Sequence, residues 1–187
     1  NDVGEAAWEE INQGVAGANY GWPNGEGYTT NPLYTSPVYA YGHGSGTSQG
    51  YAIVGGAFYN PATNSFPAQY AGKYFFMDYV NGWISYIDPV SSNPKTPTSF
   101  ASNIPSSYAG GPVDLEVGPD GSLYYLNRLG GGVFKIQYTA APPPPPVGTF
   151  TNVTVGSGVG AIVNQKYQET PNWWLSGQHL IDLDNDN

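Results

Sequence analysis

Hydrophobic and polar positions alternate in short blocks along the first 138 residues. Runs rich in Tyr, Phe, Val and Ile are separated by segments rich in Gly, Pro, Asn and Asp. This pattern is typical of short β-strands joined by tight turns. The strand candidates are residues 51–59, 74–79, 83–88, 113–117, 122–127 and 133–138. The remaining periodic piece, residues 5–12 (EAAWEEIN), predicts one or two turns of helix.

Two turns between these runs predict β-hairpins. Gly118-Pro119-Asp120-Gly121 combines the fixed φ of proline with a glycine suited to the left-handed region. Asn81-Gly82 predicts a second hairpin, with a type I′ turn. Because no helical crossover separates the strand candidates, we expect an all-β array, whether sandwich, barrel or propeller.

A proline run divides the chain. Residues 142–146 are five consecutive prolines, which favour an extended spacer. We therefore expect a β-domain over residues 1–139, a Pro-rich linker over 140–148, and a second region over 149–187 that is short for a domain.

Charge and composition narrow the classes of partner. Five Lys and Arg against fourteen Asp and Glu give a net charge of −9, which disfavours nucleic acid and anionic membrane surfaces. The absence of cysteine excludes disulfides, thiolate metal sites and Cys nucleophiles. No apolar run approaches the roughly 18 residues that a membrane span requires. The chain begins at Asn1, so we interpret it as an internal fragment or a processed piece.

Several motifs occur together in one order: residues 2–27 (DVGEAAWEEINQGVAGANYGWPNGEG), 36–46 (SPVYAYGHGSG), 53–59 (IVGGAFY), 66–84 (FPAQYAGKYFFMDYVNGWI) and 112–138 (PVDLEVGPDGSLYYLNRLGGGVFKIQY). This series resembles the glucose/sorbosone dehydrogenase family. The resemblance implies a six-bladed β-propeller that oxidises sugars with pyrroloquinoline quinone (PQQ) and calcium, and an extracellular or periplasmic location. A blade takes about 40–45 residues, so 138 residues supply three blades at most, and we expect the C-terminal half of a propeller.

The resemblance also implies site residues. The family's general base lies in its N-terminal blades, and His43 is a candidate substitute, the alternative being a packing residue in a Gly-rich loop. Main-chain carbonyls matching Gly4 and Glu5 hold the family's cofactor calcium, and Glu10 matches a carboxylate of a second, structural calcium. Glu9 and Glu10 also fit a solvated acidic face.

The sequence departs from the family pattern at the positions where family members place basic residues against the carboxylates of the quinone. Gly111 and Val113 stand at the places of arginines, and Val80 and Asn81 at the place of a lysine. A tricarboxylate without such contacts should bind weakly. Arg128 is a candidate replacement, although an ordinary surface arginine is the alternative.

Two motifs follow the linker, residues 149–160 (TFTNVTVGSGVG) and 172–187 (NWWLSGQHLIDLDNDN). Together they resemble the start of an FG-GAP or VCBS-type β-repeat. Asp182, Asp184 and Asp186 alternate as in a DxDxD calcium loop, with a plain acidic turn as the alternative.

Three functions are compatible with these observations. The first is a secreted PQQ-dependent aldose dehydrogenase, in which hydride passes from the sugar to the quinone. The second is a non-catalytic propeller that binds carbohydrate or protein, and the third is a structural envelope protein. Seven aromatic residues offer faces for sugar stacking or for packing between blades: Tyr20, Trp22, Tyr28, Tyr39, Tyr41, Trp83 and Tyr124.

Overall fold

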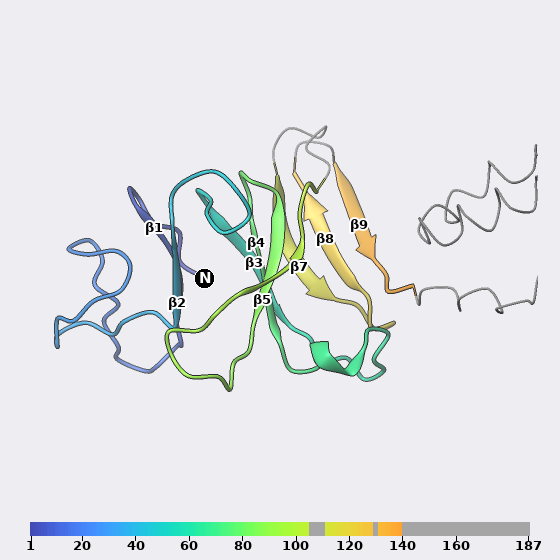
Figure 1. Ribbon diagram of the computed structural model, residues 1–187, viewed down its shortest axis with the longest axis horizontal. Helices are drawn as coiled ribbons and strands as arrows, with labels where there is room; N and C mark the ends of the chain where they lie inside the picture. The colour runs from blue at the N-terminus through green and yellow to red at the C-terminus, as the bar shows by residue number, and fades with distance from the viewer. Residues whose placement is uncertain (105–110, 129–130, 140–187) are drawn as a thin grey trace, which may run out of the picture. The chain divides into compact units, whose positions relative to one another are not determined.

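Antiparallel strand pairing organises the part of the chain that the computed structural model describes, residues 1–104, 111–128 and 131–139. The strands are β1 (Trp8–Ile11), β2 (Tyr39–Gly42), β3 (Ile53–Phe58), β4 (Tyr74–Asp78), β5 (Trp83–Ile87), β6 (Thr98–Ala101), β7 (Pro112–Val117), β8 (Leu123–Asn127) and β9 (Gly132–Ile136), with a short 3₁₀ turn, η1, at Ala68–Tyr70. They form three sheets, in the orders β1-β2, β3-β4-β5-β6 and β7-β8-β9 (Figure 1). The predicted linker and the region over residues 149–187 lie outside the described residues.

The predicted strands are all present, and the predicted helix is wrong. The six strand candidates correspond to β3, β4, β5, β7, β8 and β9. Residues 8–11 form β1 instead of a helix, paired with β2 in the register Glu9 opposite Tyr41. Tertiary pairing overrides the helix-like pattern here because Glu9 and Glu10 are buried rather than solvated. Strands β2 and β6, which were not predicted, complete the sheets.

Both predicted hairpins form, but one turn differs from its expected type. Gly121 has φ +76° in the β7–β8 connection, as the Pro-Asp-Gly sequence predicts. The β4–β5 connection runs from Asp78 to Trp83, which leaves four loop residues rather than two. Only Gly82 of that loop has a positive φ, and its N–H donates to the Asp78 carbonyl at 3.1 Å. The type I′ prediction is therefore wrong, because that turn needs positive φ at both central residues.

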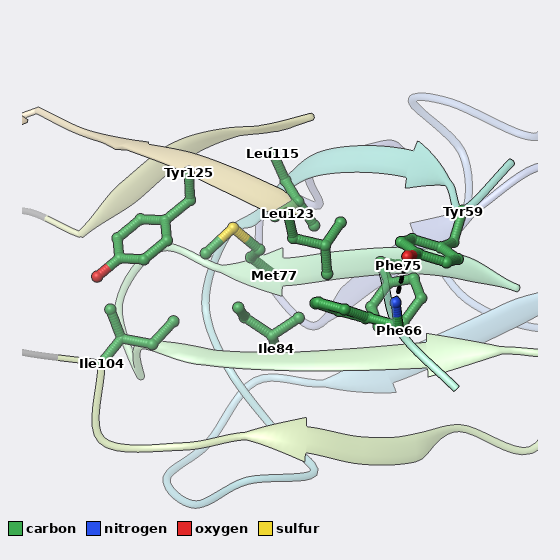
Figure 2. Close-up of a cluster of buried hydrophobic side chains, with 9 residues drawn as sticks. All are labelled: Tyr59, Phe66, Phe75, Met77, Ile84, Ile104, Leu115, Leu123 and Tyr125. Carbon is green, nitrogen blue, oxygen red and sulfur yellow. Dashed lines mark hydrogen bonds between the residues drawn. The ribbon is translucent and has the colours of Figure 1, made fainter. Parts of the chain in front are cut away.

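The central strands β4 and β5 of the sheet β3–β6 are buried on both faces, which divides the core into two clusters. Phe75 and Met77 of β4 point into a cluster shared with β7 and β8 (Figure 2). Phe76, between them in the sequence, points into a second cluster with β1 and β2. Alternate residues of a strand face opposite sides, so one strand contributes to both interfaces. Successive antiparallel sheets packed face to face in this way confirm the all-β class and the partial β-propeller of about three blades.

A double glycine lets β3 pack against β7. The register of β3 against β4 shifts between Val54 and Ala57, at Gly55 and Gly56. Gly55 has φ +62°, and a Cβ placed on it would come within 2.8 Å of the Leu115 Cβ. Only glycine meets both demands without strain.

A carboxylate fixes the segment that leads into β1. Glu26 accepts backbone N–H donors from Glu5 at 2.5 Å, Ala7 at 2.8 Å, Ala6 at 3.1 Å and Trp8 at 3.2 Å. Partial burial alone would raise the pKa of Glu26, but these backbone donors together lower it below 4.5. Glu26 therefore orders residues 5–8, which carry one of the expected calcium carbonyls.

Replacement of Gly55 by alanine should destabilise the fold by about 2–4 kcal/mol, because a left-handed alanine and an overpacked contact add their costs. The free energy of unfolding from urea titration measures this change. Gly25→Ala is the matched control, since Gly25 has open space around its Cα and no positive φ. Equal destabilisation by the two variants would contradict the packing argument.

Glu26→Gln should flatten the acid side of the stability profile. A carboxylate whose folded pKa is lowered stabilises the fold above its ordinary value of 4.5, and this contribution is lost as pH falls through the lower folded value. Unfolding midpoints should therefore fall less between about pH 5 and pH 3 in the variant than in the native protein. Glu116→Gln, on an exposed position of β7, is the control and should keep the native slope.

Candidate functional site

A buried carboxylate holds His43 at the end of β2. Glu9, in β1, is 0% exposed, and its Oε1 lies 2.8 Å from Nε2 of His43. The other oxygen, Oε2, accepts the N–H of Ile53 at 2.7 Å. His43 also donates its backbone N–H to the Ala7 carbonyl at 2.9 Å. One carboxylate thus joins β1, the loop after β2 and the start of β3.

This pairing gives the imidazole a defined orientation. A carboxylate only accepts, so the hydrogen-bond network assigns the proton to Nε2 and leaves Nδ1 of the neutral ring as an acceptor. The His43 side chain is 18% exposed, and its ring centroid lies 5.4 Å from that of Tyr51. A carboxylate-oriented imidazole with one free acceptor nitrogen is the arrangement of a general base. Sequence reasoning found His43 but treated Glu9 as half of a solvated acidic face, an alternative that the burial of Glu9 contradicts.

A second buried carboxylate makes the neighbouring loop rigid. Asp78 Oδ2 accepts from the Tyr41 hydroxyl at 3.0 Å and from the N–H groups of Tyr51 and Ala52 at 2.9 and 3.1 Å. Gly50 is required beside it, since a Cβ there would overlap the Asp78 carboxylate. Burial, reinforced by the charges of Asp78 and Glu9, raises the pKa of Tyr41 and keeps its hydroxyl protonated.

Asn81 closes the same loop from the other side. Its Nδ2 donates to the carbonyls of Gly44 at 2.8 Å, Gln49 at 2.9 Å and Gly46 at 3.2 Å. The Gln49 carbonyl also accepts Trp83 Nε1 at 2.8 Å. The amide at the place of the family lysine therefore has a structural role in holding the His43 loop.

The other places of family basic residues offer no positive charge either. Gly111 has no room for a side chain, because a Cβ would overlap the Tyr79 carbonyl oxygen. Val80 is exposed, and Val113 lies within β7. Arg128 follows β8, and its N–H donates to the Gly111 carbonyl at 3.4 Å, which places it across from this position. Arg128 is exposed and forms no ion pair with the described residues.

The other described cations are already engaged. Lys73 lies 2.5 Å from Asp88 and Lys135 lies 2.8 Å from Asp120. Lys95 donates to two backbone carbonyls. The described residues therefore do not make up the set of cations that a tricarboxylate such as PQQ requires, since Arg128 alone is uncommitted among them.

Two of the expected calcium residues lie around one small hollow. Gly4 and Glu10 line it together with Asp2 and Glu26. Burial raises the pKa of Glu10, and the charges of Asp2 and Glu26 add to this effect, while hydrogen bonds from Gly27 and Asn12 oppose it. Oxygen donors of this kind suit calcium. Among the described residues, however, no three acidic or His side chains are arranged to hold a metal ion, so a cation here would need main-chain carbonyls as well.

The remaining candidates divide between the core and the undescribed part of the chain. Tyr39, Tyr41 and Trp83 are buried between sheets, which is the packing alternative, and burial raises the pKa of Tyr39 to about 12. Trp22 and Tyr28 are exposed. Asp182, Asp184 and Asp186 lie outside the described residues. No helix in the described part of the chain is long and apolar enough to cross a membrane.

Comparison with known proteins identifies the fold. No family model matches the chain. It is 30% identical over 150 residues to the HIPL2 protein of Arabidopsis thaliana, a match that covers 69% of this chain and 21% of that protein. Two solved structures described as glucose dehydrogenase superpose with TM-scores of 0.57 and 0.56, at 19% and 17% identity, each over 74% of this chain. The chain spans 40% of each of those chains. Its described strands therefore have a propeller fold like that of these sugar dehydrogenases.

Proposed function

We propose that the protein is a sugar dehydrogenase-like propeller that binds an aldose and oxidises one of its hydroxyl groups. The fold likeness to two glucose dehydrogenases carries this proposal. The orientation of His43 by Glu9 supports it, because Nδ1 is left as the acceptor for the proton of a hydroxyl group. Asp78 and Asn81 hold the His43 loop in place for that task.

The finer parts of the proposal rest on the sequence resemblance. The oxidant is PQQ, with Arg128 among its contacts. Calcium binds at the Gly4 and Glu5 carbonyls and at Glu10. The protein has an extracellular or periplasmic location. The oxygen donors around Gly4 and Glu10 are of the chemical type that calcium prefers. Calcium at Asp182, Asp184 and Asp186 in an FG-GAP-like repeat belongs to the same proposal.

A specific observation favours a second candidate function, a non-catalytic propeller that binds carbohydrate. Gly111 has no space for a basic side chain, and Asn81 is committed to three loop carbonyls. A propeller with these two features can retain a sugar site while lacking a strong site for a tricarboxylate.

Dye reduction by the full-length protein distinguishes the two functions. With PQQ, calcium and a panel of aldoses, the dehydrogenase proposal predicts aldose-dependent reduction. Arg128→Gln should raise the PQQ concentration for half-maximal rate about tenfold or more, because one charge-assisted hydrogen bond is worth about 1.5–3 kcal/mol. Lys135→Gln, which removes a cation already paired with Asp120, is the control.

His43→Asn in the same assay should lower kcat more than KM, because the change removes the proton acceptor rather than sugar contacts. Saturable aldose binding with no dye reduction under any of these conditions would reject the dehydrogenase and favour the non-catalytic propeller.

A further inference from the structure

A pocket lies at the end of the sheets opposite His43. Phe58 ends β3, Tyr74 begins β4 opposite it and Ile87 ends β5, and all three line the pocket. His43 is instead held near Ile53, the first residue of β3, which pairs with Asp78 at the other end of β4. The pocket volume is about 370 Å³. Pockets of about 300–1,000 Å³ are usual for small-molecule ligands.

The interior of the pocket is apolar and includes an aromatic face. Ile11, Val38 and Ile87 are buried aliphatic residues of its lining. Phe58 is 54% exposed, and its ring packs against Tyr74 with centroids 4.9 Å apart. An accessible ring held by a second ring offers a flat surface to the C–H face of a sugar.

Neutral polar groups and one ammonium complete the lining. Lys95 Nζ donates to the Pro89 carbonyl at 2.9 Å and the Ser91 carbonyl at 2.8 Å, which leaves one of its three N–H donors. The Tyr74 hydroxyl donates to Asn1 Oδ1 at 2.9 Å, so this hydroxyl can still accept. These groups and the Gln13 amide line the same pocket as the apolar residues.

Asn12 adds an unsatisfied acceptor to this wall. Its Nδ2 donates to Glu10 at 3.2 Å, whereas its Oδ1 is buried and has no partner among the described residues. A buried acceptor without a partner is unfavourable, so a donor that reaches Asn12 Oδ1 would favour binding.

We propose that this pocket binds a neutral sugar ring, at a site separate from that of His43. No carboxylate side chain is part of the described lining, so a cation has no counter-charge there. Its one cationic side chain among the described residues, Lys95, is shared between two carbonyls, which disfavours a multiply charged anion. An aromatic face beside several neutral donors and acceptors matches a ring that has one apolar face and hydroxyl groups at its edge.

Methyl resonances report occupancy of this site directly. In full-length protein with ¹³C-labelled isoleucine methyl groups, methyl β-D-glucopyranoside should shift the Ile11 and Ile87 signals saturably. It should leave Ile84 and Ile104, in the other core cluster, unshifted. Phe58→Ala should weaken this binding about tenfold or more, and Phe58→Trp should retain it, because the aromatic face is the main contact. Val133→Ala, which shortens an exposed apolar side chain on β9, is the control and should leave the affinity unchanged.

The result is separable from that of the dehydrogenase proposal. His43→Asn should lower the kcat of dye reduction while leaving the Ile11 and Ile87 titration unchanged. Absence of saturable shifts at these methyl groups up to about 10 mM sugar, or equal affinities in Phe58→Ala and the native protein, would overturn the pocket proposal.

Discussion

Two carboxylates with no exposure to solvent join the sheet β1-β2 to the sheet β3–β6. Glu9 and Asp78 are both 0% exposed, and removal of a charge from water is costly unless the charge is fully hydrogen-bonded. Glu9 accepts from His43 and Ile53, and Asp78 accepts from one hydroxyl and from backbone N–H groups on both sides of it in the sequence. Breaking either set leaves an uncompensated buried charge, so the loop that carries His43 and the β4–β5 hairpin are ordered together.

This constraint is compatible with the packing because the carboxylates lie at the edge of an otherwise apolar interface. Tyr41 illustrates the arrangement, since its ring packs 5.2 Å from that of Trp83 while its hydroxyl reaches Asp78. The sheet β3–β6 presents alternate residues to two neighbours, so a change on either face of β4 affects a separate interface. Apolar burial supplies most of the stability, and the buried polar groups define which strands meet.

The strands that could be predicted from the sequence are those whose own residues show the strand pattern. Strands β4 and β8 are rich in aromatic residues and flanked by turn residues, so local pattern alone identifies them. Strand β1 could not be found in this way, because Glu9 and Glu10 are typical of a solvated surface until β2 and the loop to β3 cover them.

Prediction of the site from the sequence is limited for the same reason. His43 was identified by its chemistry, but its partner Glu9 lies 34 positions away and is defined only by tertiary pairing. The four-residue β4–β5 loop has a related cause, since Asp78 binds the N–H groups of Val80 and Asn81 and so replaces the two-residue turn that Asn-Gly favours.

The same tertiary contacts bear on which ligands this partial propeller can hold. Asn81 and Gly111 differ from the pattern of the family that the sequence resembles, and each is required where it stands. The amide of Asn81 binds three carbonyls, and the hydrogen of Gly111 faces the Tyr79 carbonyl. A basic residue could not be introduced at either position without rebuilding the loop around His43 or the start of β7. The absence of a cation at these two positions is therefore tied to the packing around them. A chain with net charge −9 and so few uncommitted basic groups among its described residues is better suited to neutral ligands than to polyanions. The packing around Asn81 and Gly111 contributes to this preference, whichever of the two proposed functions the protein performs.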